Sequence, residues 1–286
     1  MLEFIKQHPV ATMAIAIAII ALIALISWIA WSNKAIELNS VVVRADASGL
    51  KIAHISDFHN AKFKNNNEEL LSLVKEAQPD IIAITGDLID SRHTNVQVSI
   101  DFVSELVKIA PVYYVPGNHE SRIEDEYNTL KQALTDFGVT ILCDSKTTLE
   151  KDGQIFTIIG IEDPMFVLEK DSVKGARAVI SEKLTPLMQN TEGYTIVLSH
   201  RPEAFEEYVS AGVDLALTGH AHGGQVQLPL IGGLIAPNQG FFPKYSEGVH
   251  EKNGTTMIIS RGIGNSLCPV RVNNRPEIIL ITMENE

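Results

Sequence analysis

The chain has 286 residues, of which 45% are apolar, and 23 Lys and Arg against 35 Asp and Glu give a formal net charge of −12. Affinity for nucleic acid depends mainly on Lys and Arg neutralising phosphates, so no nucleic acid polymer is expected as a partner of so acidic a protein. The apolar content excludes disorder. Two cysteines, Cys143 and Cys268, are too few for a disulfide framework or a Cys-based zinc site, and we expect unpaired packing residues.

The amino-terminal part of the chain contains an uncharged run of 22 residues, Val10 to Trp31, which is long enough to cross a bilayer as a helix. A buried core helix and a cleaved signal peptide are the alternatives to a membrane anchor. The run lacks the polar face of a core helix, and it is longer than the apolar stretch of a signal peptide. Trp28 and Trp31 suit a membrane interface. We expect a single-pass anchor in the cell membrane, and the flanking charges do not determine its orientation. The expected organisation is a leader at 1–9, the anchor at 10–32, a tether at 33–48 and one domain at 49–286.

Short apolar runs alternate with helical patterns beyond residue 48. Runs of β-branched residues bounded by Gly, Pro or Asp predict buried strands. These strands are expected at 51–56, 80–85, 112–115, 155–161, 194–199, 215–218, 255–260 and 277–282, and amphipathic helices at 68–77, 101–109 and 125–137. Strand–helix alternation followed by a more β-rich second half predicts an α/β layered sandwich.

Polar side chains follow five of the predicted strands. The five fragments are Asp57-x-His59, Gly86-Asp87 with Asp90, Gly117-Asn118-His119-Glu120, His200, and Gly219-His220-x-His222. The carboxyl ends of parallel strands meet at one edge of a sheet, so these side chains are expected to converge. Carboxylate, amide oxygen and imidazole are suitable ligands for Mn, Fe or Zn. Each fragment alone is also typical of a turn or a capped helix start, but five in this order predict a metal site.

This series of fragments resembles the calcineurin-like metallophosphoesterases over roughly residues 50–283. The stretches 198–202, 219–225 and 260–262 are similar to the membrane-anchored bacterial branch, which includes enzymes that cleave the pyrophosphate of UDP-2,3-diacylglucosamine. Ala221 stands where that branch commonly has Thr, at a position that is not a ligand. The resemblance implies a four-layer α-β-β-α sandwich of the α/β class, preceded here by the transmembrane helix.

The resemblance also implies two divalent metal ions bridged by Asp87. The implied ligands are Asp57, His59 and His222 for one ion, and Asn118, His200 and His220 for the other. His119 would lie over the substrate, oriented by Asp90. A hydroxide held between two such ions would attack phosphorus in line, and His119 would protonate the leaving oxygen or donate a hydrogen bond to it. Asp90 is expected to favour the protonated form of His119.

Two arginines beside the motifs, Arg92 and Arg201, are candidates for clamping phosphate oxygens, and salt bridges elsewhere are their alternative role. The apolar segment Gln225–Tyr245 directly follows the last motif. It is expected to line the pocket, to meet an acyl chain at the bilayer, or, slightly favoured, to pack as a hairpin over the sheet.

The leading hypothesis is a membrane-anchored dinuclear phosphoesterase acting on a phosphoester or pyrophosphate, including lipid-linked substrates such as UDP-2,3-diacylglucosamine. One alternative is a nuclease or cyclic-nucleotide phosphodiesterase. Another is a non-catalytic metal-binding scaffold, although the presence of His119 and Asp90 disfavours it. The sequence indicates no obligate protein partner.

Overall fold

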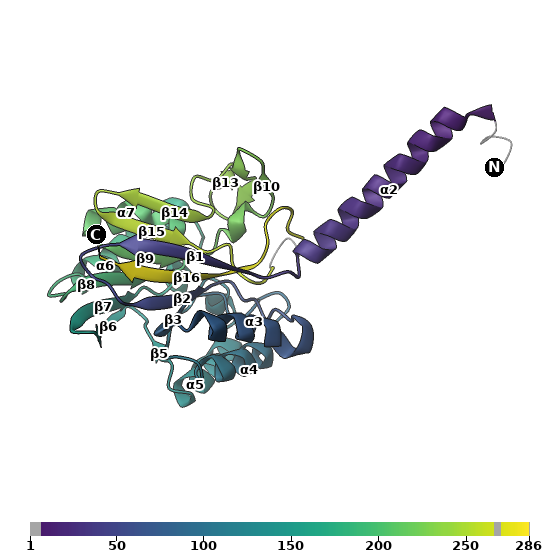
Figure 1. Ribbon diagram of the computed structural model, residues 1–286. Helices are drawn as coiled ribbons and strands as arrows, with labels where there is room; N and C mark the ends of the chain where they lie inside the picture. Colours follow the sequence, from purple (N-terminus) through teal and green to yellow (C-terminus); the bar gives the residue numbers. More distant parts are fainter. Residues whose placement is uncertain (1–6, 266–269, 286) are drawn as a thin grey trace.

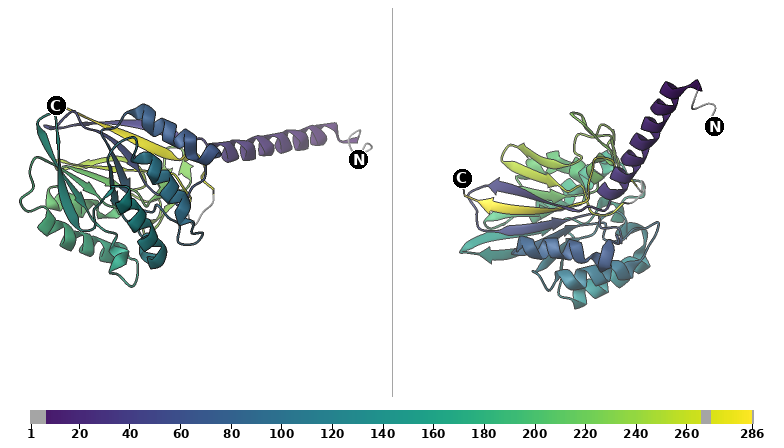
Figure 2. Two further views of the ribbon diagram at one scale, coloured as in Figure 1. Left: turned by 90° about the horizontal axis from the view of Figure 1, so that it is seen from below. Right: turned by 45° about the vertical axis from the view of Figure 1, so that its right-hand side comes forward.

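Two six-stranded sheets lie face to face, with helices on both outer sides (Figures 1 and 2). The structure is a computed structural model that describes residues 7–265 and 270–285. The arrangement is the four-layer α-β-β-α sandwich expected from the sequence, so the predicted α/β fold class is confirmed. Residues 1–6 of the expected leader, and Cys268, lie outside the described residues.

The first sheet is mainly parallel at its centre, where β2, β3 and β4 lie side by side. Its order is β1 (Glu37–Arg44), β16 (Glu277–Glu284), β2 (Lys51–Ile55), β3 (Ile81–Thr85), β4 (Val112–Val115) and β5 (Thr140–Ile141). Every residue of β3 and β4 is buried, because layers cover both faces of the sheet. The parallel pairing brings the carboxyl ends of these three strands to one edge.

The second sheet has four parallel central strands, β7, β8, β9 and β15, between antiparallel edge strands. Its order is β14 (Gly248–Lys252), β15 (Thr255–Ile259), β9 (Leu215–Thr218), β8 (Tyr194–Leu198), β7 (Gln154–Gly160) and β6 (Ser145–Lys151). Apolar side chains such as Ile52, Ala83 and Leu198 fill the space between the two sheets.

Helices close the two outer faces. The first sheet is covered by α3 (Lys64–Ala77), α4 (Val96–Leu106) and α5 (Glu124–Asp136), and the second by α6 (Val173–Leu187) and α7 (Phe205–Ala211). Short 3-10 turns occur at Glu120–Arg122, Pro164–Phe166, Pro202–Ala204 and His222–Gly224. The residues Asn65 to Asn67 at the start of α3 have non-helical backbone angles, so its regular part matches the helix expected at 68–77.

The segment expected to be a tether, residues 33–48, contains a strand. Over its whole length, from Glu37 to Arg44, β1 pairs in parallel with β16, and it adds an edge to the first sheet. Its sequence, ELNSVVVR, is mostly half-exposed and therefore lacks the continuous apolar run that indicates a buried strand. The polar edge strands β6 and β14, and the helices α6 and α7, were not predicted either.

Helix α2 (Pro9–Ser32) projects away from the sandwich (Figure 1). Its most apolar 18-residue stretch has a mean hydropathy of 2.8 and is not buried against the rest of the structure. The length and composition suit a membrane span, and a signal sequence shares them. Beside its inner end lies a lobe, residues 226–243, built from β10 (Gln227–Leu228), β11 (Gly232–Gly233), β12 (Ile235–Ala236) and β13 (Gly240–Phe241) (Figure 1).

Candidate metal centre

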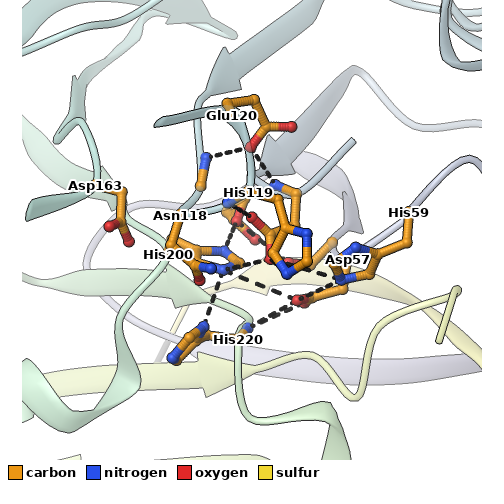
Figure 3. A network of polar contacts seen from close by, with 12 residues as sticks. Asp57, His59, Asn118, His119, Glu120, Asp163, His200 and His220 are labelled. Atoms are coloured by element: carbon orange, nitrogen blue, oxygen red, sulfur yellow. Dashed lines mark hydrogen bonds and ion pairs between the residues drawn. The ribbon is translucent and has the colours of Figure 1, made fainter. Parts of the chain in front are cut away.

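The residues expected to be ligands come together at the carboxyl edges of the two sheets (Figure 3). They follow β2, β3 and β4 of the first sheet and β8 and β9 of the second. The seven side chains are all buried: Asp57, His59, Asp87, Asn118, His200, His220 and His222. Residues as far apart in the sequence as 57 and 222 therefore face one small volume, as the strand-end argument predicted.

Asp57, His59 and His222 form the first cluster of donor atoms. Asp57 Oδ1 lies 3.4 Å from His222 Nε2 and 3.8 Å from His59 Nε2. The two Nε2 atoms lie 3.3 Å apart. This close approach of two imidazole nitrogens and a carboxylate is suited to a cation between them.

Asp87, His200 and His220 form the second cluster. Asp87 Oδ2 lies 3.2 Å from His200 Nε2, which in turn lies 3.2 Å from His220 Nδ1. Asn118 Oδ1 is buried and has no hydrogen-bond partner among the described residues. Because a buried carbonyl oxygen is seldom left without a partner, this atom is a further candidate ligand.

The carboxylate of Asp87 lies between the two clusters. Its Oδ2 is 3.5 Å from His59 Nε2 in the first cluster and 3.2 Å from His200 Nε2 in the second. Its Oδ1 accepts the backbone N–H of His119 at 2.8 Å. Oδ1 is therefore hydrogen-bonded to the loop of His119. Oδ2 lies where a ligand shared by two ions would have to lie.

The backbone at the ligands adopts conformations that cost energy. Asp57, Asp87 and His220 have φ angles of 51°, 53° and 65°, in the left-handed region that residues other than glycine rarely occupy. Such conformations are typical of functional sites, where the surrounding structure holds them. At Gly117 a Cβ atom would overlap the Asp87 side chain, so the close approach of these two loops requires glycine.

The electrostatics of the centre favour positive charge. Burial alone would lower the pKa of His200, but the carboxylates of Asp87 and Asp57 raise it to about 10. Burial opposes ionisation of Asp87. The neighbouring imidazoles of His200 and His119 nevertheless hold the pKa of Asp87 well below the usual range. A buried donor set that stabilises cations in this way fits divalent ions, which would replace the protons on the imidazoles.

His119 lies beside the centre, with Nε2 4.0 Å from Asp87 Oδ2. Its Nδ1 accepts the backbone N–H of Ser91 at 2.9 Å, which places the proton of the neutral ring on Nε2. Burial lowers the pKa of His119 to about 4, while the carboxylates of Asp87 and Asp90 act in the opposite direction, as expected for Asp90 from the sequence. Asp90 Oδ1 is 3.7 Å from Nδ1, and it accepts the N–H of Arg92 at 2.6 Å. Asp90 therefore shapes the Ser91 loop that positions the ring.

The two candidate arginines differ in their surroundings. Arg92 is an exposed residue that lines the pocket in front of the centre. Arg201 is fully buried, and its guanidinium pairs with Asp163 at 2.6 Å and with Asp171 at 3.2 Å. It also lies 3.1 Å from His220 Nε2, behind the second cluster. The structure thus corrects the expected phosphate clamp at Arg201, which makes the salt bridges that were its alternative role.

Glu120 has a role that the sequence analysis missed. Its buried carboxylate accepts the backbone N–H groups of Asp87 at 3.0 Å, Ile89 at 3.1 Å and Gly117 at 2.8 Å. Burial and the nearby Asp87 raise the pKa of Glu120 to about 7. The signal in the sequence was an acidic residue directly after a strand-end loop, where backbone N–H groups lack partners.

Two further arginines near the centre were also missed. Arg122 lines the pocket. Arg271 is fully buried, and its Nη2 lies 3.3 Å from His222 Nδ1. Neither residue stands within a motif, so only the folded structure brings them to the site.

A pocket of about 420 Å³ opens over the two clusters. Its lining combines metal-site residues, two arginines and an apolar wall from the lobe: Asp87, Arg92, Asn118, His119, Arg122, Asp171, His220, His222, Gln225, Ile235, Ala236, Pro237 and Asn238. The volume is that of a small-molecule site, and its lining has both polar and apolar residues.

Residues 50–224 match the calcineurin-like phosphoesterase family. The chain belongs to this family. Its sequence is 27% identical to that of the uncharacterized metallophosphoesterase YkoQ of Bacillus subtilis, over 93% of this chain and 97% of that protein. It is 29% identical to the phosphodiesterase YaeI of Escherichia coli, over 83% of each chain. A crystal structure of a dimetal phosphatase from Danio rerio is 12% identical, with a TM-score of 0.48 over 82% of this chain and 99% of that one.

Membership of this family makes the metallophosphoesterase a phosphoester hydrolase with clusters of His and Asp that could hold divalent metal. The predicted family and the predicted enzyme class are therefore confirmed.

Proposed function

We propose that this metallophosphoesterase is a membrane-anchored enzyme with a dinuclear centre. Asp87 would be shared by the two ions. Asp57, His59 and His222 would complete one site, and Asn118, His200 and His220 would complete the other. The observation that carries this proposal is the position of Asp87 Oδ2, which lies within 3.5 Å of imidazole nitrogens from both clusters. Mn, Fe and Zn all suit a set of carboxylate, amide and imidazole ligands without thiolate.

The ions, when bound, would activate water and neutralise charge on the phosphoryl oxygens. The chain's own residues do the rest. His119 donates a hydrogen bond or a proton from Nε2 to the leaving oxygen, and Ser91 fixes the orientation of its ring. Arg92 and Arg122, which line the pocket, bind the anionic group.

An amphiphilic phosphoester suits the pocket. Its lining contains both residues of the ligand clusters with two arginines and an apolar segment, Ile235, Ala236 and Pro237. A membrane anchor raises the local concentration of any substrate in the same bilayer. UDP-2,3-diacylglucosamine is one lipid-linked substrate of this kind. The relative named a phosphodiesterase supports hydrolysis of a phosphodiester.

We place the anchor at residues 10–32, in the cell membrane, and the catalytic domain at 49–286 with β1 added to its first sheet. The exposed apolar surface of α2 supports this division. The most apolar stretch of α2 is not buried against the rest of the structure, whereas Asn33, directly after the helix, is hydrogen-bonded to the backbone of Arg271.

A substrate panel tests the proposal. The full-length protein in detergent is assayed with Mn, Fe and Zn on phosphomonoesters, linear and cyclic diesters, and a UDP-linked lipid. Metal-dependent hydrolysis is expected, and the Asp87→Asn variant is the matched control. Hydrolysis by this variant at the wild-type rate would contradict the dinuclear centre. Cleavage restricted to cyclic or linear nucleotides would favour the nuclease or cyclic-nucleotide phosphodiesterase, and metal binding without hydrolysis would favour the scaffold.

A further inference from the structure

Exposed apolar side chains gather in the lobe, residues 226–243, beside the pocket. Of the ten large apolar side chains that are exposed in the described residues outside α2, five lie there. They are Leu230, Ile231, Ile235, Phe241 and Phe242. The lobe has no charged residue between His222 and Lys244. A concentration of exposed apolar groups without charge is typical of a surface that is covered by another molecule or by a membrane.

Two of these residues also have backbone conformations that are unfavourable for residues other than glycine. Leu230 and Phe242 have φ angles of 67° and 53°, in the left-handed region, where Gly, Asn or Asp costs least. Leu230 is fully exposed, and Phe242 is 60% exposed. Both turns thus use an apolar residue where a small polar one would suit the backbone and the solvent better. Exposed apolar residues at such turns are typical of a surface that contacts another apolar surface.

The position of the lobe indicates what covers it. Asn33, at the inner end of α2, exchanges two hydrogen bonds of 2.7 Å with the backbone of Arg271. In the same segment, Val272 forms a bridge with Val226 and accepts the N–H of Gln227 at 2.9 Å. The base of the lobe and the inner end of α2 are therefore held side by side, as Figures 1 and 2 show.

The tryptophans of α2 mark the level of the bilayer surface. Trp28 and Trp31 lie at the inner end of the helix, and the guanidinium of Arg275 lies 5.1 Å from the ring of Trp31. Tryptophan prefers the boundary between acyl chains and headgroups. With α2 in the membrane, that boundary passes close to residue 31, and the lobe lies next to it.

We propose that the lobe is a second membrane contact, which inserts Leu230, Ile231, Phe241 and Phe242 into the bilayer interface beside α2. The proposal rests on the proposed function, because it takes α2 as an anchor. An uncharged element with an apolar surface is suited to lie in the plane of the interface. The partner is therefore a lipid bilayer.

This contact assigns the class of substrate. Ile235, Ala236 and Pro237 belong to the lobe and also form the apolar wall of the pocket. The pocket mouth therefore opens at the membrane surface. A phosphoester headgroup reaches the ligand clusters from there, while its apolar chain stays against the lobe and the bilayer. The substrate is an amphiphile that the enzyme takes from the membrane without releasing it to water.

A depth measurement tests the contact in the full-length protein. In a Cys143→Ser and Cys268→Ser background, Leu230→Cys is labelled with a polarity-sensitive fluorophore and placed in nanodiscs with brominated acyl chains. Val42→Cys is the matched control, because Val42 is 49% exposed on β1 and pairs with Thr282 near the carboxyl terminus, at the end of the sandwich away from α2 (Figure 1). Quenching of at least about twofold is expected at Leu230 and none at Val42, since only the former lies among acyl chains. Equal signals would overturn the proposal, as would a signal at Leu230 that depends on protein density, which indicates a second copy.

An activity measurement separates this inference from the proposed function. Leu230, Ile231, Phe241 and Phe242 are replaced together by Ser, and Ile235 is kept because it lines the pocket. The kcat/KM on a phosphodiester amphiphile in vesicles is expected to fall about tenfold, because one of two membrane contacts is lost. The kcat/KM on soluble bis-p-nitrophenyl phosphate stays unchanged. An equal effect on both substrates would overturn the inference. A wild-type protein that hydrolyses neither would overturn the proposed function, while the quenching still decides the position of the lobe.

Discussion

The backbone N–H of His119 donates to Asp87 Oδ1 at 2.8 Å, so the loop that carries the proposed acid is attached to the proposed bridging ligand. The other oxygen, Oδ2, faces His59 and His200. The two oxygens of Asp87 thus have different partners, and a substitution can alter one while it keeps the other.

The Asp87→Asn variant makes this separation. The amide oxygen can still accept the His119 N–H, so the fold is expected to persist, with an unchanged circular dichroism spectrum. The amide nitrogen replaces Oδ2 and cannot bridge two cations. Activity is expected to fall by more than about a hundredfold, which is the upper end of the loss for groups that merely support a ligand. Metal analysis should find fewer than two ions bound, and a fully loaded variant would contradict the bridging role.

The His119→Gln variant tests the acid. His119 lies with His59 and Asp90 in a third group of donor atoms, but it is not one of the seven proposed ligands, so the variant should retain its metal. Loss of a general acid costs about 10²–10⁴ in rate when the leaving group is a poor one. We expect a loss of that size on an alkyl phosphodiester and a much smaller loss on a p-nitrophenyl ester, whose leaving group needs no proton. Equal losses on the two substrates would show that His119 has another role.

The Glu120→Gln variant tests the clamp on the ligand loops. The carboxylate accepts N–H groups of Asp87, Ile89 and Gly117, and a glutamine would turn its own N–H toward at least one of them. Metal affinity is expected to fall about 10–100-fold, as for other groups that orient ligands. Calorimetric titration with Mn measures it. A saturating concentration of Mn should restore most of the activity, whereas the Asp87→Asn variant should show no such rescue.

Acid should destabilise the protein through His54. This side chain is fully buried on β2 and hydrogen-bonded to Thr85 at 2.8 Å, and burial lowers its pKa from 6.5 to about 3. Below pH 6.5 the unfolded state therefore binds a proton that the folded state does not, so stability falls as the pH falls toward 3. Between pH 6.5 and 4.5 this contributes about 2 kcal/mol.

The His54→Gln variant supplies the comparison for this pH effect. Glutamine does not titrate and can keep a bond to Thr85. Denaturant unfolding at the two pH values should show a smaller loss for the variant, while acid release of metal affects both proteins alike. Parallel losses in both proteins would contradict the assignment to His54.

The sequence predicted the buried strands and the convergence of the strand-end side chains because each has a local signal. A fully buried strand such as β3 is a continuous apolar run, and parallel pairing fixes where its last residues lie. The edge strand β1 has no such run. It is held in the sheet by pairing with β16, which follows more than 200 residues later in the sequence, so no local pattern indicates it.

Side chains that act through tertiary contacts were harder to predict. Arg201 stands next to the proposed ligand His200, yet its guanidinium is paired with Asp163 and Asp171. Asp90 was expected to orient His119, and its Oδ1 lies 3.7 Å from Nδ1, while the backbone N–H of Ser91 donates a hydrogen bond to the same nitrogen at 2.9 Å. In both cases the residue was in the expected region, and the partner, which only the fold brings close, decided its role.

The final prediction concerns removal of the anchor. A protein that lacks residues 1–30 keeps Asn33 and its two hydrogen bonds to Arg271, whose guanidinium reaches the carbonyl of Gly264 and lies beside His222. It is expected to be soluble without detergent and to hydrolyse bis-p-nitrophenyl phosphate with a kcat/KM within about threefold of the full-length value, because tethering acts on local concentration rather than on chemistry. Introducing Asn33→Ala into this shortened protein should lower its thermal stability, since the Arg271 segment loses its partner. Loss of all activity on removal of residues 1–30 would show that α2 supports the fold of the catalytic domain and does more than hold it at the membrane.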